Sequence, residues 1–285
     1  MFDSKEEVLS WYESQPRALS DDFIEAIPWN EVREHPFDER FVPVLRYMRD
    51  VETLTDMYWK ELRRTPTGRD PVISKFMERW GVEEVTHGEV LNRFVNELGY
   101  KTDDNWKTQV RSNVSMLYHI NTYLLTSLTN LIGSRFTGTH MTFGAVHEMT
   151  TAQAYRRMIE IADHPVLTSI LKGIIREESA HTHFYWSIAR LELRKDPLAQ
   201  RLARFVVENF YYPVGQGSLK RSRTRFAVAT LFDPPAVDRM IETNVTRRVQ
   251  QLPGFEGLTK VTETIGEISR DDQARAFPPL DPAII

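Results

Sequence analysis

Apolar residues recur three and four positions apart along most of the chain, which is the spacing of one face of an α-helix. Alternating runs of β-branched residues, the usual sign of strands, are scarce. The pattern predicts an all-α protein, with one domain over residues 1–285 because no linker divides the chain. Gly133 and Gly138 are expected to interrupt the helical pattern, and the proline-rich tail FPPLDPAII, 277–285, is expected to be extended. Helices are expected at 4–16, 41–64, 71–98, 104–132, 141–162, 166–195, 198–212 and 234–250.

The composition excludes several classes of functional site. The chain has no cysteine, which excludes disulfide frameworks, thiolate zinc sites, cysteine nucleophiles and cysteine-ligated iron–sulfur clusters. Any metal must therefore be held by Glu, Asp and His. The 36 Lys and Arg residues against 40 Asp and Glu give a net charge of −4, which does not favour a nucleic-acid binder. No apolar run approaches the roughly 18 residues of a membrane span. The N-terminus lacks the pattern of a secretory signal, so a cytoplasmic location is expected.

Two of the predicted long helices carry the same motif, Glu-Glu-x-x-His. It occurs at residues 83–87 as EEVTH and at 177–181 as EESAH. Residues i and i+3 share a helix face, so Glu84 and His87 can reach one point, as can Glu178 and His181. A carboxylate on an apolar face is costly to bury unless it is paired or binds a cation. The motifs therefore predict an internal metal site, and the alternative is a set of satisfied ion pairs in the core. The apolar residues on these faces include Ile73, Phe76, Trp80, Leu91, Phe94, Leu171, Ile174, Tyr185 and Ile188.

Each motif has a further glutamate on the preceding long helix. Glu52 lies on an inward face with Leu45 and Met48, and Glu148 lies on a face with Met141 and Tyr155. The chain thus repeats a helix with one Glu followed by a helix with Glu-Glu-x-x-His. Packed as a four-helix bundle, the two halves supply the four Glu and two His that are typical of ferritin-like di-iron and di-manganese carboxylate proteins. The predicted fold is a ferritin-like four-helix bundle with additional N- and C-terminal helices, and the predicted metal ligands are Glu52, Glu84, His87, Glu148, Glu178 and His181.

The types of ligand indicate which metals the site could bind, and the first acid of each motif has an expected role of its own. Carboxylate and imidazole ligands without thiolate suit two iron ions, and a manganese–iron pair fits the same set. Glu83 and Glu177 precede the predicted ligands and are expected to accept a hydrogen bond from a ligand imidazole. We expect Glu177 to orient His87 and Glu83 to orient His181. The alternative for both is an ordinary solvated glutamate.

Four segments resemble the soluble acyl-carrier-protein desaturases, a family of ferritin-like di-iron proteins. WGVEEVTHGEVLNRFV (80–95) is similar to the second ligand helix of that family, and VLRYMRDVETLTDMY (44–58) to the first. HEMTTAQAYRRM (147–158) resembles the third and ILKGIIREESAHTHFYWSI (170–188) the fourth. A weaker similarity continues through GFEGLTKVTETIGEI (254–268). The fourth motif differs, since Glu177 stands where the family usually has Asp, and Thr182 follows the histidine where the family has an acid. The chain therefore resembles a divergent, bacterial-type member.

The resemblance implies an activity and a set of partners. The family uses O2 to remove two hydrogens from an acyl chain carried on acyl carrier protein, with electrons from reduced ferredoxin, and is usually homodimeric. It also implies that Thr151, three residues after Glu148, helps to deliver protons at the metal site; a threonine bonded to its own helix backbone is the alternative. Trp29 and Trp80 are candidates for an electron path, or else are packing residues. The basic run LKRSRTRF (219–226) could steer an acidic carrier protein, or could be a solvated charged face.

Other activities fit the same ligand set. A di-iron hydroxylase or N-oxygenase acting on a specialised metabolite would keep the cluster, although related N-oxygenases add a histidine ligand where this chain has Ile174. Iron storage or a purely structural bundle is the alternative from a different class. The sequence does not distinguish a carrier protein from coenzyme A as the carrier of the acyl group.

Overall fold

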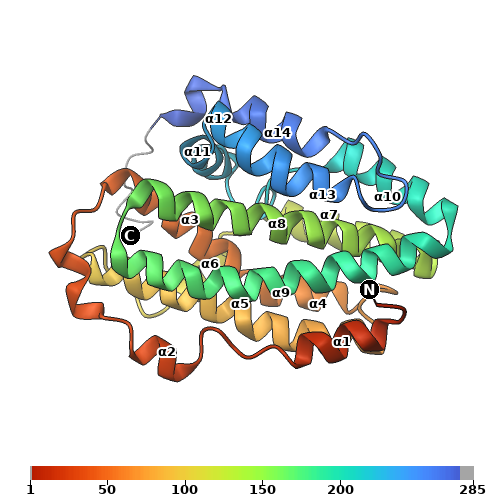
Figure 1. Cartoon of the computed structure of the whole chain (residues 1–285), viewed down its shortest axis with the longest axis horizontal. Coiled ribbons are helices and arrows are strands. Elements are labelled where there is room, and N and C mark those ends of the chain that lie inside the picture. Colours follow the sequence, from red (N-terminus) through yellow and green to blue (C-terminus); the bar gives the residue numbers. More distant parts are fainter. Residues whose placement is uncertain (1, 277–285) are drawn as a thin grey trace.

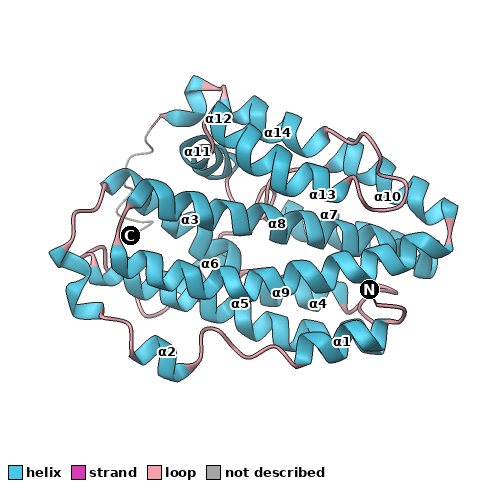
Figure 2. Ribbon diagram, in the orientation of Figure 1, coloured by secondary structure: helices cyan, strands magenta, loops and turns pink. Residues whose placement is uncertain are grey.

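The computed structural model describes residues 2–276, so the predicted extended tail at 277–285 lies outside the described residues. The described part of the chain is helical and contains no β-strand, only an isolated bridge between Gln216 and Leu219. The all-α prediction is therefore confirmed (Figure 2). None of the helices in residues 2–276 combines the length and apolar character that crossing a membrane requires.

Four helices with buried inner faces form the centre of the molecule. α8 packs on α9 and α3 packs on α5, while α5 also contacts α9 (Figure 1). The connection between α8 and α9 is short, because Asp163 adopts the left-handed conformation and His164 caps the next helix by accepting from the Leu167 amide. α8 and α9 are therefore antiparallel neighbours. The four helices are α3 (Val42–Thr53), α5 (Pro71–Glu97), α8 (Phe136–Ala162) and α9 (Pro165–Lys195).

Two predicted helices are each divided in the structure. The helix expected at 41–64 is α3 followed by α4 (Thr55–Leu62), and the break falls at Leu54, whose buried side chain packs with Trp106 and Val110. The helix expected at 104–132 is α6 (Trp106–Ser112) followed by α7 (Met116–Ile132). Ser115 begins α7 by accepting a hydrogen bond from the Tyr118 amide, which is the local reason for the second break.

The predicted interruption at Gly138 is wrong, because this residue lies within α8. A Cβ atom at Gly138 would approach the Cδ2 atom of Leu193 to 3.0 Å. The glycine therefore permits α8 and α9 to pack closely, and does not end a helix. α8 begins at Phe136, earlier than the expected start at 141.

Shorter helices cover the outer faces of these four. The C-terminal helices lie along the upper edge of Figure 1, where α11 packs on α3 and η4 packs on α8. The helix predicted at 234–250 is one run with a π-helical centre, whereas α2, α11 and α14 were not predicted. The remaining elements are α1 (Lys5–Glu13), α2 (Asp21–Glu25), η1 (Trp29–Glu34), η2 (Glu39–Phe41), η3 (Gly133–Arg135), α10 (Pro197–Phe210), α11 (Arg221–Leu231), α12 (Pro234–Ala236), η4 (Val237–Thr246), α13 (Arg247–Val249), α14 (Lys260–Ser269) and η5 (Asp272–Arg275).

The basic run at 219–226 is partly a structural element. Arg223 donates to Asp50 of α3 at 2.6 Å, and Arg225 donates to Asp271. These two guanidinium groups tie α11 to its neighbours. Lys220 and Arg221 remain exposed, so the surface available to an acidic partner is smaller than the sequence indicates.

Candidate metal centre

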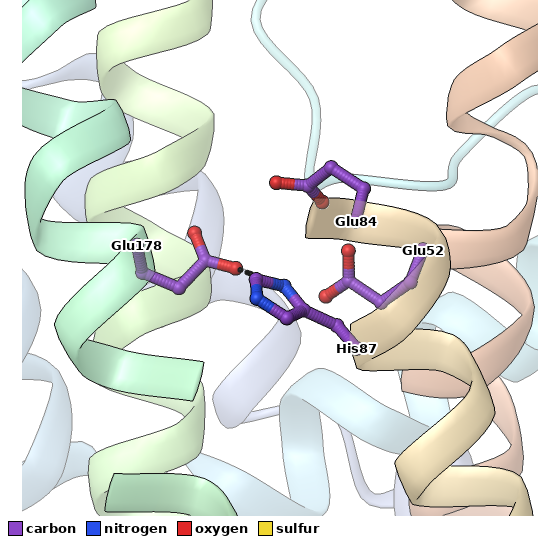
Figure 3. Close-up of side chains that lie close together, drawn as sticks. All are labelled: Glu52, Glu84, His87 and Glu178. Atoms are coloured by element: carbon purple, nitrogen blue, oxygen red, sulfur yellow. Dashed lines mark ion pairs between the residues drawn. The ribbon is translucent and has the colours of Figure 1, made fainter. Parts of the chain in front are cut away.

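The structure brings all six predicted metal ligands together between α3, α5, α8 and α9. They form two overlapping groups, and within each group one potential ligand atom from every residue lies within 4.8 Å of the others. Figure 3 shows Glu52, Glu84 and Glu178 around His87, with an ion pair drawn between His87 and Glu178. Glu84 and Glu178 belong to both groups, so each would contribute to both halves of a two-metal site. The groups are Glu52, Glu84, His87 and Glu178, and Glu84, Glu148, Glu178 and His181; every member is buried.

Each imidazole is held on its outer side by an acid from the opposite motif. The Nε2 atom of His87 lies 2.9 Å from Glu177, and the Nε2 atom of His181 lies 2.8 Å from Glu83. These are the pairings predicted from the sequence, and each links α5 to α9. Both Nδ1 atoms are thereby directed to the cluster, where that of His181 lies 3.0 Å from Glu84. A carboxylate behind an imidazole fixes the ring and its tautomer, which is the usual arrangement of metal-binding histidines.

Several buried polar atoms at the centre of the cluster make no well-formed hydrogen bond and instead face one another, with His181 Nδ1 3.0 Å from Glu84 Oε1 and His87 Nδ1 3.3 Å from Glu178 Oε1. They are Oε1 of Glu84, both carboxylate oxygens of Glu178, and Nδ1 of His87 and of His181. Buried polar atoms are almost always hydrogen-bonded, so five unsatisfied atoms that converge on one space need an explanation. All five are good ligands for a divalent cation. In a neutral imidazole that carries its proton on Nε2, the Nδ1 atom has a free lone pair and can bind the cation. The donor set therefore fits two metal ions.

The electrostatics of the four central carboxylates also favour bound cations. Burial, followed by repulsion from neighbouring glutamates, raises the pKa values of Glu52, Glu84 and Glu178. Burial acts in the same direction on Glu148, but its hydrogen bonds with His181 and Glu178 outweigh it and lower the pKa. When all four carboxylates are ionised their charge is −4, which two divalent ions would neutralise.

The two outer acids differ from the central ones because they have cationic and hydrogen-bonding partners of their own. Glu83 accepts from the Tyr12 hydroxyl at 2.5 Å and from Arg79 at 2.8 Å. Although burial opposes the effect, hydrogen bonding to His181, Tyr12 and Arg79 lowers the pKa of Glu83 to about 2. Glu83 is therefore an anion that holds His181 without needing a metal.

Glu177 is held in a similar way by the N-terminal segment. It accepts from the backbone amides of Ala18 and Leu19, at 2.8 and 3.1 Å, and from Nε of Arg17 at 3.1 Å. Burial again opposes the effect, yet hydrogen bonding and charge attraction from His87, assisted by the Leu19 amide and Arg17, lower the pKa of Glu177 to about 2. Sequence reasoning missed this contribution of the N-terminal segment, because contacts between residues about 160 positions apart leave no local pattern.

Two aromatic side chains hold the unshared glutamates. The Tyr155 hydroxyl donates to Glu52, and Nε1 of Trp80 donates to Glu148 at 3.1 Å. Trp80 therefore contacts a predicted ligand directly. Trp29 instead donates to the Ile24 carbonyl, with the Arg93 guanidinium 4.1 Å above its ring. An electron path through either tryptophan stays a prediction.

A cavity of about 200 Å³ opens onto the cluster. Glu52, Glu84 and Glu148 form part of its wall, and its other walls are mostly apolar side chains such as Met77, Met141 and Phe143. A second, almost wholly apolar pocket of about 60 Å³ continues beyond the carboxylates. Thr151 lies on the wall of both pockets and so borders the space beside the cluster. Its role in proton delivery stays a prediction. Residues that line both pockets are Val51, Glu52, Thr151 and Val214.

His140 lies on the wall of the larger pocket, away from the predicted ligands. Its Nδ1 atom is buried and has no hydrogen-bond partner, and burial lowers the pKa of this histidine to about 4. His147 also faces this pocket, but it hydrogen-bonds to the Tyr212 carbonyl. Ile174, where related N-oxygenases have a histidine, is a fully buried apolar residue.

Neither a known protein-family model nor a curated protein sequence matches this chain. The function is therefore inferred from the geometry and chemistry of the site.

Proposed function

We propose that the protein is an O2-dependent oxidoreductase with two iron ions, of the ferritin-like di-iron carboxylate type; a manganese–iron pair is the alternative metal content. The observation that carries this proposal is the convergence of four buried carboxylates and two oriented imidazoles whose inner atoms make no well-formed hydrogen bond. Glu52, Glu84, His87, Glu148, Glu178 and His181 would hold the metals. Bound iron would supply oxygen activation and the change of redox state.

The reaction we propose is the introduction of a double bond into an acyl chain carried by acyl carrier protein or coenzyme A. The substrate –CH2–CH2– group loses two hydrogens and becomes –CH=CH–. Reduction of O2 to two molecules of water takes four electrons and four protons, of which the substrate supplies two of each. A ferredoxin-type donor supplies the other two electrons, and the remaining two protons come from solvent.

The pockets beside the cluster support a substrate with an apolar chain. The almost wholly apolar pocket beside Glu52 can take part of such a chain, and the wider pocket, which shares Glu52 and Thr151 with it, can take the rest. Apolar walls exclude water from a strongly oxidising site, which protects the reaction from side products. Thr151 lines both pockets, and we assign to its hydroxyl the transfer of a proton towards the cluster. A cavity of this size at the cluster also favours an enzyme over an iron-storage or structural bundle.

A second candidate function is oxygenation of a specialised metabolite by the same cluster. The observation that favours it is His140, whose unsatisfied Nδ1 atom borders the larger pocket. A neutral imidazole at that point suits a substrate with a hydrogen-bonding group, which a simple acyl chain lacks.

The test is to load the protein with ferrous iron, add a ferredoxin reducing system and O2, and offer a panel of acyl-carrier-protein and coenzyme A thioesters. Mass spectrometry of the released acyl groups reads the result. Loss of two hydrogens supports desaturation, and a gain of one oxygen moves the assignment to an oxygenase. Unchanged substrates, despite bound iron that O2 oxidises, would overturn the assignment of carrier-linked acyl chains.

A further inference from the structure

A third pocket lies on the outer side of α8 and α9, where η4 and α13 run beside α8 (Figure 1). This outer pocket is lined by side chains from residues 149–156, 179–182 and 243–251, and its volume is about 600 Å³. None of the described residues lines both the outer pocket and a pocket at the cluster. Thr151 lines the cluster pockets and Gln153 the outer pocket, and residues two apart on a helix point in nearly opposite directions. The outer pocket is therefore separate from the proposed substrate cavity.

The lining of the outer pocket is basic. Arg156, Arg247 and Arg248 contribute to it, whereas no Asp or Glu within residues 2–276 does. Arg156 and Arg248 form no ion pair with a described residue. The Nε atom of Arg247 lies 3.5 Å from Glu242, which is outside the lining. Burial lowers the pKa of the Arg156 guanidinium, because the positive charge has lost water without gaining a hydrogen-bonded acid. Such surroundings favour a bound anion.

Most of the remaining lining consists of hydrogen-bonding side chains. Asn244 donates to the Oε1 atom of Gln153 at 3.1 Å. This contact leaves the NH2 group of Gln153 and the amide oxygen of Asn244 available to a ligand. The buried Thr182 of α9 lines the same space. A ligand of this pocket is therefore expected to carry polar groups in addition to its negative charge.

One wall of the outer pocket has an unusual backbone. η4 is π-helical over Val237–Thr246, and the Arg247 amide donates to the Glu242 carbonyl, five residues earlier. Thr243 and Asn244 of this run line the pocket, and Arg247 follows the run directly. π-Helical turns are rare in proteins and occur frequently at functional sites. The backbone and the arginines thus give two independent reasons to expect a ligand here.

We propose that the outer pocket binds a small organic phosphate, with its phosphate groups held by the three arginines. A guanidinium stays charged and presents paired N–H donors that match phosphate oxygens. Three positive charges suit a group with two or more negative charges, such as a phosphate monoester or a diphosphate. The volume lies within the range of about 300–1,000 Å³ for small-molecule sites and exceeds what one phosphate fills. The rest of the ligand would therefore meet the amides and hydroxyls of the lining.

The first experiment is isothermal titration calorimetry of the natural chain and of the variant E84Q/E178Q at physiological ionic strength. The probes are adenosine 5′-diphosphate, coenzyme A and pyrophosphate, with adenosine and citrate as phosphate-free controls. We expect at least one phosphate probe to bind both proteins with a Kd below about 1 mM, and neither control to bind. Stronger binding of coenzyme A assigns the site to the phosphates of an acyl carrier, and stronger binding of adenosine 5′-diphosphate to those of a free nucleotide.

Three outcomes would overturn the proposal. They are the failure of all three phosphate probes to bind, equal binding of citrate, and loss of binding in E84Q/E178Q. The last outcome would place the phosphate on metal ions at the cluster. Because E84Q/E178Q lacks two of the proposed ligands, phosphate binding by this variant does not depend on the proposed function.

A second experiment locates the bound phosphate by substitution of the arginines. R156Q and R248Q should each weaken binding by about 10- to 100-fold, which corresponds to the loss of one charged hydrogen bond. R201Q is the matched control, because Arg201 is exposed on α10 and lines none of the three pockets; its affinity should equal that of the natural chain. Unchanged affinity in both R156Q and R248Q would contradict this site.

Thermal unfolding gives a measurement that does not rely on the heat of binding. A ligand that binds only the folded state raises the midpoint of unfolding. The phosphate probe that binds best should therefore raise the midpoint of the natural chain and of R201Q, and leave that of R156Q/R248Q unchanged. An equal rise in all three proteins would place the phosphate elsewhere on the molecule.

Discussion

Two regions of this molecule place residues against the usual rule of polarity, and they do so in opposite directions. α5 and α9 bury acids and histidines, with Glu178 and His181 fully inaccessible to solvent, whereas α7 exposes leucines and methionine. The buried region has more acids than basic side chains at its centre, and the exposed region lacks apolar contact among the described residues. A bound cation would compensate the buried acids, and an apolar surface would cover the exposed side chains. The comparison teaches that the kind of misplaced residue indicates the kind of missing partner.

The largest expected effect comes from removing the two acids shared by both ligand groups. The double variant E84Q/E178Q should lower metal affinity by more than about 100-fold, because loss of residues that merely orient ligands already costs about 10- to 100-fold. Metal content after equilibrium dialysis against ferrous iron measures this, with circular dichroism to show that the fold is kept. E267Q, an exposed acid of α14, is the matched control. Full metal content in the double variant would show that the buried acids serve the core alone.

A somewhat smaller effect should appear in the pH dependence of stability after metal removal. Burial raises the folded-state pKa values of Glu52, Glu84 and Glu178. Burial opposes the effect at His87 and His181, but hydrogen bonds to the surrounding glutamates outweigh it and raise the pKa of both imidazoles. These groups therefore contribute stability that is present at low pH and lost as the pH rises through the raised values. The free energy of unfolding of the chelator-treated protein should therefore fall from pH 5 to 8, by about 1.4 kcal/mol per pH unit for each extra proton that the folded state binds.

Urea denaturation at four pH values, with and without ferrous iron, provides the measurement. Bound metal keeps the ligands deprotonated, so the metal-loaded protein should not show this fall. Glu83 and Glu177 act in the opposite sense, but their pKa values of about 2 place that loss of stability far below this range. The E178Q variant, which lacks one of the raised groups, should give a shallower slope. Identical slopes for loaded and metal-free protein would contradict the metal site.

The smallest effect compares two glycines of α5. A Cβ atom at Gly88 would lie 2.8 Å from the Thr53 hydroxyl and 3.2 Å from the Arg49 carbonyl, whereas one at Gly81 would meet nothing within 4 Å. G88A should destabilise the protein by about 1–3 kcal/mol, because α3 and α5 would have to separate beside His87. G81A should stabilise it by roughly 0.5–1 kcal/mol. Urea denaturation compares the two, and equal effects would show that the close approach of the helices is unimportant.

The sequence was informative about the centre of the site for a physical reason. Spacing within a helix is a local property, so the two motifs and the upstream Glu52 and Glu148 were sufficient to place six side chains in one interior. The pairings of Glu83 with His181 and Glu177 with His87 followed from the same repeat. The contacts that hold the outer acids, Glu83 and Glu177, were not predictable from the sequence. Tyr12 and Arg17 reach the outer acids across long separations in sequence.

Which face of a helix is buried is likewise a property of the whole fold. The apolar residues at 116–132 predicted a helix, and the structure contains one. Their spacing normally indicates an inward face, yet in α7 the threonines are turned inward. The basic run at 219–226 shows the same limit, because only the fold reveals that Asp50 and Asp271 hold two of its arginines.

The N-terminal segment has a kinetic consequence for the site. Tyr12, Arg17 and the amides of Ala18 and Leu19 supply no ligand, but they hold the two acids that keep the imidazoles in place. A histidine leaves a metal when its ring rotates, and rotation requires that these outer contacts open first. Detachment of the first twenty residues would leave all six ligands present and still shorten the residence time of the bound ions. The exchange rate of bound metals would thus depend on a segment that supplies none of their ligands.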